Sequence, residues 1–208
     1  MKGRTVQRYE IATLSTSMGA AAKAAPAIEA FASEGKGRLL GIFYADIGAL
    51  NRVLVFRGFE TAADYDAERD RTLRAANPFG SAEWLTGLEL EGYAPFPFLP
   101  PVETGSFGPA YEFRTYVLKT GGLEPTIRAW EAAVPARTEL SKLAICMYGI
   151  DGRPRMTHIW PFASVNERGQ IRADSVAQGV WPPKGGPDWL TTDMRSTIAF
   201  PTANSPLK

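Results

Sequence analysis

Tyr9-Glu-Ile-Ala-Thr13 and Tyr111-Glu-Phe-Arg-Thr115 are two versions of one short segment, separated by 102 residues. Further matches keep nearly the same spacing: Leu40-Gly-Ile42 with Leu143-Ala-Ile145, Arg52 with Arg155, and Phe59 with Phe162. A repeat that keeps its order along a whole chain indicates two copies of one structural unit. The sequence therefore predicts two halves of about equal length, 1–105 and 106–208, packed as one structural unit.

Both halves show the same order of strand-like and helix-like segments. Tyr, Val, Ile, Phe and Thr, which strands favour, dominate the opening segments, and Asp151-Gly152 predicts a tight hairpin. The expected strands are 6–14, 38–46, 52–58 and 86–94, then 111–118, 142–150, 155–162 and 194–200. The expected helices are 18–34 and 61–75, one starting near Leu123, and 164–172.

The order β-α-β-β-α-β is that of the ferredoxin-like unit. A single such sheet leaves one face uncovered, and a second copy in the same chain can cover it. The predicted fold class is therefore α+β, a tandem duplication in which two antiparallel sheets pack as a barrel with the helices outside.

The composition excludes several classes of protein. The net charge is +1 with no basic cluster, which argues against nucleic-acid binding. Cys146 is the only cysteine, so no internal disulfide forms and a reducing compartment is expected. The opening residues lack the apolar core of a secretion signal, and no stretch reaches the ~18 apolar residues of a membrane helix. The expected location is the cytoplasm, without membrane insertion.

No cofactor and no metal are expected. One histidine and one cysteine fall short of the three or four ligands that zinc requires. Gly35-Lys-Gly37 resembles the start of a dinucleotide fingerprint, but it leads from a helix to a strand, which is the wrong order.

His158 is the candidate for acid–base chemistry, because it is the only histidine. It alternates with Met156, Trp160 and Phe162 on one strand face. These apolar neighbours favour a buried structural histidine, and the alternative is a catalytic histidine that faces a ligand.

Glu112, Arg114 and Tyr116 share one face of the strand that opens the second half. They form either a structural ion pair with a tyrosine cap or the polar wall of a ligand pocket. Arg155 and Arg195 would add positive charge there and favour an anionic or enolate-like ligand.

Trp181 lies in the Gly/Pro-rich stretch 173–193, which is long enough to be a binding loop or a surface that contacts a partner.

Several motifs, in this order, resemble the NIPSNAP family within the dimeric α+β barrel superfamily. They are Ile47-Gly-Ala-Leu-Asn51, Ala67-Glu-Arg69, Tyr111-Glu-Phe-Arg-Thr-Tyr116, His158-Ile-Trp-Pro-Phe162, Asn166-Glu-Arg168 and Ser205-Pro-Leu207. The halves differ, since the family's His-x-Trp pattern is intact only in the second half, and Val55 and Arg57 replace it in the first.

The resemblance implies the fold and gives few functional details, because the family has no agreed activity. Its superfamily includes cofactor-free monooxygenases, chlorite-dismutase-like haem proteins and stress-response barrels, which share a pocket between sheet and helices. The resemblance therefore implies a small organic ligand in the second half, near His158, Trp160, Arg114 and Tyr116. Proton abstraction or oxygen addition on an enol-like aromatic substrate would suit it.

The alternative is a non-catalytic interaction or stress-related protein that uses exposed sheet edges and the stretch 173–193. A homo-oligomer is expected from the habit of the superfamily and from the apolar linker Ala94-Pro-Phe-Pro-Phe-Leu-Pro-Pro101.

Overall fold

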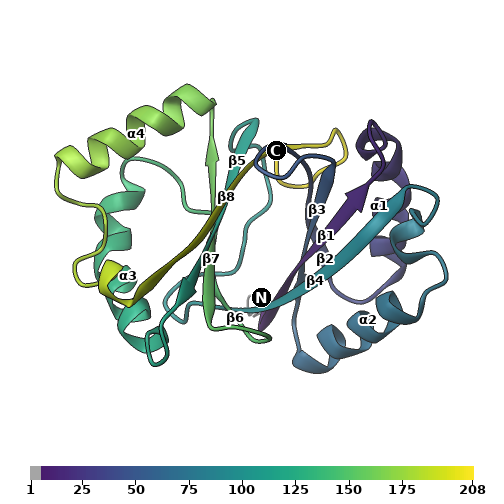
Figure 1. The fold of residues 1–208 in the computed structure, drawn as a ribbon, viewed down its shortest axis with the longest axis horizontal. Coiled ribbons are helices and arrows are strands. Elements are labelled where there is room, and N and C mark those ends of the chain that lie inside the picture. Colours follow the sequence, from purple (N-terminus) through teal and green to yellow (C-terminus); the bar gives the residue numbers. More distant parts are fainter. Residues whose placement is uncertain (1–5) are drawn as a thin grey trace, which may run out of the picture.

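The computed structural model describes residues 6–208, which form two βαββαβ units in sequence (Figure 1). The first consists of β1 (Arg8–Thr16), α1 (Ala21–Glu34), β2 (Arg38–Ile47), β3 (Arg52–Phe59), α2 (Ala62–Arg74) and β4 (Leu85–Pro95). The second consists of β5 (Ala110–Leu118), α3 (Leu123–Thr138), β6 (Ile145–Gly149), β7 (Arg155–Phe162), α4 (Val165–Ala177) and β8 (Leu190–Pro201). The predicted first half also includes residues 1–5, which lie outside the described residues.

The strands close into one barrel in the order β1-β3-β2-β8-β5-β7-β6-β4. Two seams join the halves: β2 pairs with β8, with Phe43 opposite Pro201, and β4 pairs with β6, with Ala94 opposite Tyr148. The expectation of exposed sheet edges is therefore wrong for residues 6–208, because each edge strand pairs with an edge strand of the other half. Backbone groups that would attract another chain are already hydrogen-bonded.

The two faces of each strand serve different layers. One face fills the barrel with large side chains, and Phe43 of the first half packs on Tyr111 of the second at 4.8 Å between ring centroids. The other face lies under the helices, with α1 and α2 covering the first half and α3 and α4 the second (Figure 1). The predicted α+β barrel with external helices is thus confirmed.

The last described segment ties the second half to the first. Leu207 is fully buried in the barrel core, and its amide donates to the carbonyl of Leu40. The Ser205 hydroxyl accepts from the amide of Ile42 in β2. These contacts add a third connection between the halves beside the two seams.

Most predicted boundaries agree within a few residues, and the hairpin at Asp151-Gly152 is present, with Gly152 at φ 62°. The stretch 173–193 is the main correction. α4 continues to Ala177 and β8 begins at Leu190, so the irregular part shrinks to 178–189, with a short 3-10 turn at Pro187–Trp189. The extra length of β8 depends on its pairing with β5, a long-range contact that local sequence does not reveal.

None of the helices within residues 6–208 is long and apolar enough to cross a membrane.

Candidate functional site

His158 lies between the sheet and the helices of the second half. Its Nδ1 accepts a hydrogen bond from the indole Nε1 of Trp160 at 2.7 Å. An indole nitrogen only donates, so the proton of the neutral imidazole is on Nε2. That Nε2 is buried and has no hydrogen-bond partner among the described residues. Burial lowers the pKa of His158 to about 3, so at neutral pH it is a hydrogen-bond donor and not a charged group.

Aromatic rings surround this imidazole. Tyr116 of β5 lies 5.3 Å from it and Trp130 of α3 lies 4.9 Å from it, between ring centroids. Trp181, from the segment 178–189, packs edge-on against Trp130 at 4.8 Å. Tyr116, Trp160 and Trp181, three of the predicted ligand-binding residues, therefore gather around His158.

Glu112 is buried nearby and accepts from Arg168 Nη2 at 2.5 Å and from the Ser196 hydroxyl at 2.7 Å. Arg114 Nη1 lies 3.4 Å from the same carboxylate oxygen. Burial alone would raise the pKa of Glu112, but these hydrogen bonds and the charge of Arg114 outweigh it and lower that pKa. The carboxylate therefore stays ionised.

Two guanidinium groups, those of Arg168 and Arg114, contact this carboxylate, and its charge also acts on Arg137 and Arg172. We call Arg114, Arg137, Arg168 and Arg172 the arginine cluster. The guanidinium of Arg137 stacks over Trp160, with its central carbon 4.4 Å from the ring centroid. Burial and the charge of Arg172 lower the pKa of Arg137, while burial and the charge of Arg114 lower that of Arg172. The Nε atoms of Arg114 and Arg168 are buried without a partner among residues 6–208. The site thus holds an excess of positive charge and of unused donors.

The equivalent place in the first half is electrically balanced. Arg57 lies between Glu10 at 2.5 Å and Glu68 at 2.7 Å, and Arg71 lies 2.5 Å from Glu68. Two carboxylates thus match two guanidinium groups. In the second half Trp160 occupies the place of Arg57, since it stands opposite Glu112 as Arg57 stands opposite Glu10.

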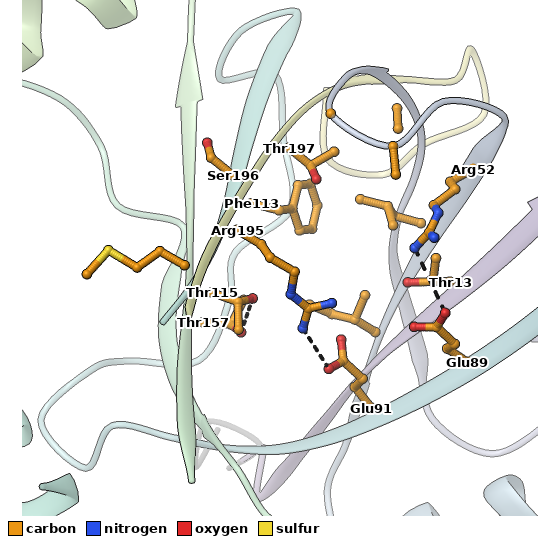
Figure 2. A pocket seen from close by; sticks show the side chains of 16 residues that line it. Thr13, Arg52, Glu89, Glu91, Phe113, Thr115, Thr157, Arg195, Ser196 and Thr197 are labelled. Atoms are coloured by element: carbon orange, nitrogen blue, oxygen red, sulfur yellow. Dashed lines mark hydrogen bonds and ion pairs between the residues drawn. The ribbon is translucent and has the colours of Figure 1, made fainter. Parts of the chain in front are cut away.

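Arg195 is the predicted site residue that the structure does not bring to His158. Ser196 faces Glu112, so Arg195, its neighbour on β8, faces the other side of the sheet. There it lines a cavity of about 380 Å³ at one end of the barrel (Figure 2). Arg155 is likewise on the inner face of β7 and pairs with Asp151 at 2.6 Å.

Arg137, Arg168 and Arg172 were not predicted from the sequence as site residues. Arg168 and Arg172 are four residues apart and therefore share one face of α4, which was a usable signal. No sequence signal marked Arg137, because the position of its side chain depends on how α3 crosses the sheet.

Within residues 6–208 no group of three or more His, Cys, Asp or Glu side chains is arranged to hold a metal ion.

A closed barrel of two ferredoxin-like units with helices outside defines the dimeric α+β barrel class. The NIPSNAP family model matches residues 7–87 and 111–206, one stretch in each half. The chain belongs to the NIPSNAP family.

Solved structures share the fold at low sequence identity. A protein from Lactobacillus acidophilus NCFM, provisionally described as a monooxygenase, is 12% identical with a TM-score of 0.67, and the match covers 96% of this chain and 98% of that one. An anthrone oxidase-like protein is 11% identical with a TM-score of 0.67, over 100% and 97% of the two chains. A NIPSNAP family protein of unknown function from Agrobacterium tumefaciens is 26% identical with a TM-score of 0.44, over 49% and 96%. No curated protein matches the sequence.

Proposed function

We propose that this protein binds a small organic anion between the sheet and the helices of the second half. The arginine cluster carries the proposal, because four guanidinium groups interact electrostatically with the single carboxylate of Glu112 and only those of Arg114 and Arg168 contact it. Buried donors without partners are costly, and an anionic ligand would satisfy several of them together.

The surroundings of the cluster narrow the ligand class. Trp130, Trp160 and Trp181 present flat apolar surface beside the guanidinium groups. Such a combination suits a planar aromatic acid or the enolate of an aromatic ketone, which stacks on rings while its negative oxygen accepts from arginine.

His158 supports the stabilisation of a negatively charged oxygen on such a ligand. A neutral imidazole that donates from Nε2 stabilises an oxyanion without being a base itself, and the arginine cluster adds positive charge. An enolate held in this way is the species that oxygen attacks in a cofactor-free oxygenation, in which a CH2 group and O2 give a carbonyl group and water. Proteins with this fold that are described as a monooxygenase or as anthrone oxidase-like agree with that reaction class. We propose this oxygenation as the reaction that the protein carries out on its bound ligand.

The test is a titration with 2-naphthoate followed by tryptophan fluorescence, since three of the five tryptophans line the proposed site. We expect saturable quenching, and at least tenfold weaker binding, about 1.4 kcal/mol, in the double variant Arg168→Gln, Arg172→Gln. Arg128→Gln is the matched control, because Arg128 is 74% exposed on α3. The uncharged 2-naphthalenemethanol should bind weakly to all forms.

Equal affinity of 2-naphthoate for the double variant and the wild type would refute the proposal, and so would an absence of binding to the wild type. Self-association and a cytoplasmic location stay predictions, and light scattering over a range of concentrations measures the first.

A further inference from the structure

The cavity at the end of the barrel is separate from the arginine cluster. Strands of both halves wall it, and it lies on the inner face of the sheet (Figure 2). His158 lies on the outer face, against Trp130 of α3. Its volume of about 380 Å³ falls at the lower end of the range of small-molecule sites, roughly 300–1,000 Å³. The volume suits a ligand much smaller than a nucleotide.

Two ion pairs line this cavity, and in each the two partners are too far apart for a short hydrogen bond. Arg195 lies 3.6 Å from Glu91, and Arg52 lies 3.9 Å from Glu89 (Figure 2). Charge-assisted hydrogen bonds between such groups are usually about 2.7–2.9 Å long. Arg195 and Glu89 are more than half exposed, so these pairs contribute little to stability and remain free to bind other partners.

The charges around the cavity cancel. Two guanidinium groups face two carboxylates, and Arg155, which also reaches Glu91 at 3.3 Å, is held by Asp151 at 2.6 Å. A simple anion would leave the glutamates repelling it, and a simple cation would leave the arginines repelling it. A ligand that carries both charges matches this arrangement, because each of its charges finds an opposite partner.

Deeper in the cavity the lining becomes apolar. Ile11, Leu54 and Phe113 belong to the barrel core and form part of the wall. Thr115 and Thr157 share a hydrogen bond of 2.8 Å at its side, so their hydroxyl groups are partly occupied. A ligand would fit this cavity if its charged groups lay at the opening and its apolar group packed against Phe113.

We propose that the barrel cavity binds a zwitterionic amino acid with an apolar side chain. Its carboxylate would contact Arg52 or Arg195, its ammonium group would contact Glu89 or Glu91, and its side chain would enter toward Ile11, Leu54 and Phe113. This site is independent of the anion site proposed for the second half.

The test is isothermal titration calorimetry of the full chain with L-leucine. We expect saturable binding, and at least tenfold weaker binding, about 1.4 kcal/mol, of N-acetyl-L-leucine, which lacks the ammonium group, and of L-leucinamide, which lacks the carboxylate. L-serine should also bind at least tenfold more weakly, because it lacks the apolar group.

Substitutions of the charged residues that line the cavity test whether L-leucine binds there. Glu89→Gln and Arg195→Gln should each weaken L-leucine binding while leaving the urea midpoint unchanged, since both side chains are more than half exposed. Arg128→Gln is the control, because Arg128 is 74% exposed on α3, and it should bind L-leucine as the wild type does. The proposal is overturned if L-leucine produces no binding heat into the millimolar range, if the single-charge analogues bind equally well, or if both cavity variants bind normally.

Discussion

At pH 7 the imidazole of His158 is neutral, because burial lowers its pKa to about 3 and nearby arginines oppose a further positive charge. In the unfolded chain the same histidine titrates near pH 6.5. Between these two pH values the unfolded state binds a proton that the folded state does not. The contribution of the neutral His158 to the free energy of unfolding is therefore fully present above about pH 6.5, and it is lost as the pH is lowered.

We expect the free energy of unfolding to fall by about 2 kcal/mol between pH 7 and pH 5. Because His158 is the only histidine and most carboxyl groups stay ionised above pH 5, this loss belongs to one side chain. Urea unfolding at the two pH values measures it. His158→Gln, whose amide oxygen can still accept from Trp160, should abolish the dependence, and the same slope in that variant would contradict the assignment.

The alternation of side chains along a strand was sufficient to predict which residues of β5 and β7 share one face of the sheet. His158 and Trp160 on β7 do lie on the face that also carries Glu112, Arg114 and Tyr116 on β5. Arg195 was grouped with them because the sequence did not show which face of β8 points into the barrel. That choice depends on pairing with β5, and a shift of one residue reverses every side chain.

At the scale of the element, α4 is weakly held. Ser175 alone among its residues is buried, and its inward side carries Arg168 and Arg172 in place of a continuous apolar stripe. Its start is fixed by Ser164, whose hydroxyl accepts from the amide of Glu167 at 3.0 Å. With so little apolar packing, the cap supplies a larger share of the helix's stability than is usual.

Ser164→Ala should therefore speed amide hydrogen exchange throughout α4, by an amount that corresponds to about 1 kcal/mol. The matched control is Thr61→Ala, which removes the same kind of cap from α2, where the Thr61 hydroxyl accepts from the amide of Asp64 at 3.0 Å. α2 buries Tyr65 and Glu68 against the sheet, so its exchange should change less. Equal changes in both helices would show that α4 is not the weaker one.

At the scale of the whole molecule, the two seams and the Leu207 segment predict that the halves unfold together. Leu207→Ala removes a fully buried side chain from the core that both halves share, which typically costs about 2–5 kcal/mol. Urea unfolding should show a single transition at a lower midpoint, whereas Leu73→Ala, on a 62% exposed residue, should change little. Two separate transitions in the variant would contradict this shared core.

The duplication was visible because matched segments such as those beginning at Tyr9 and Tyr111 keep their spacing, and it was enough to predict the class of fold. The closure of the two sheets into one barrel could not be predicted from the sequence. The pairing of Ala94 with Tyr148 and of Phe43 with Pro201 joins strands that belong to different copies. Nothing in the local sequence distinguishes such a seam from an edge left open for another chain.

A barrel built from one chain also has a genetic consequence. In a symmetric pair of identical subunits every substitution occurs twice, so a change that benefits one copy is imposed on the other. Here the balanced Glu10–Arg57–Glu68 network and the arginine cluster occupy matching places, yet each is encoded separately. One copy can keep its stabilising ion pairs while the other accumulates uncompensated charge, so evolution can change the chemistry of one half without altering the other.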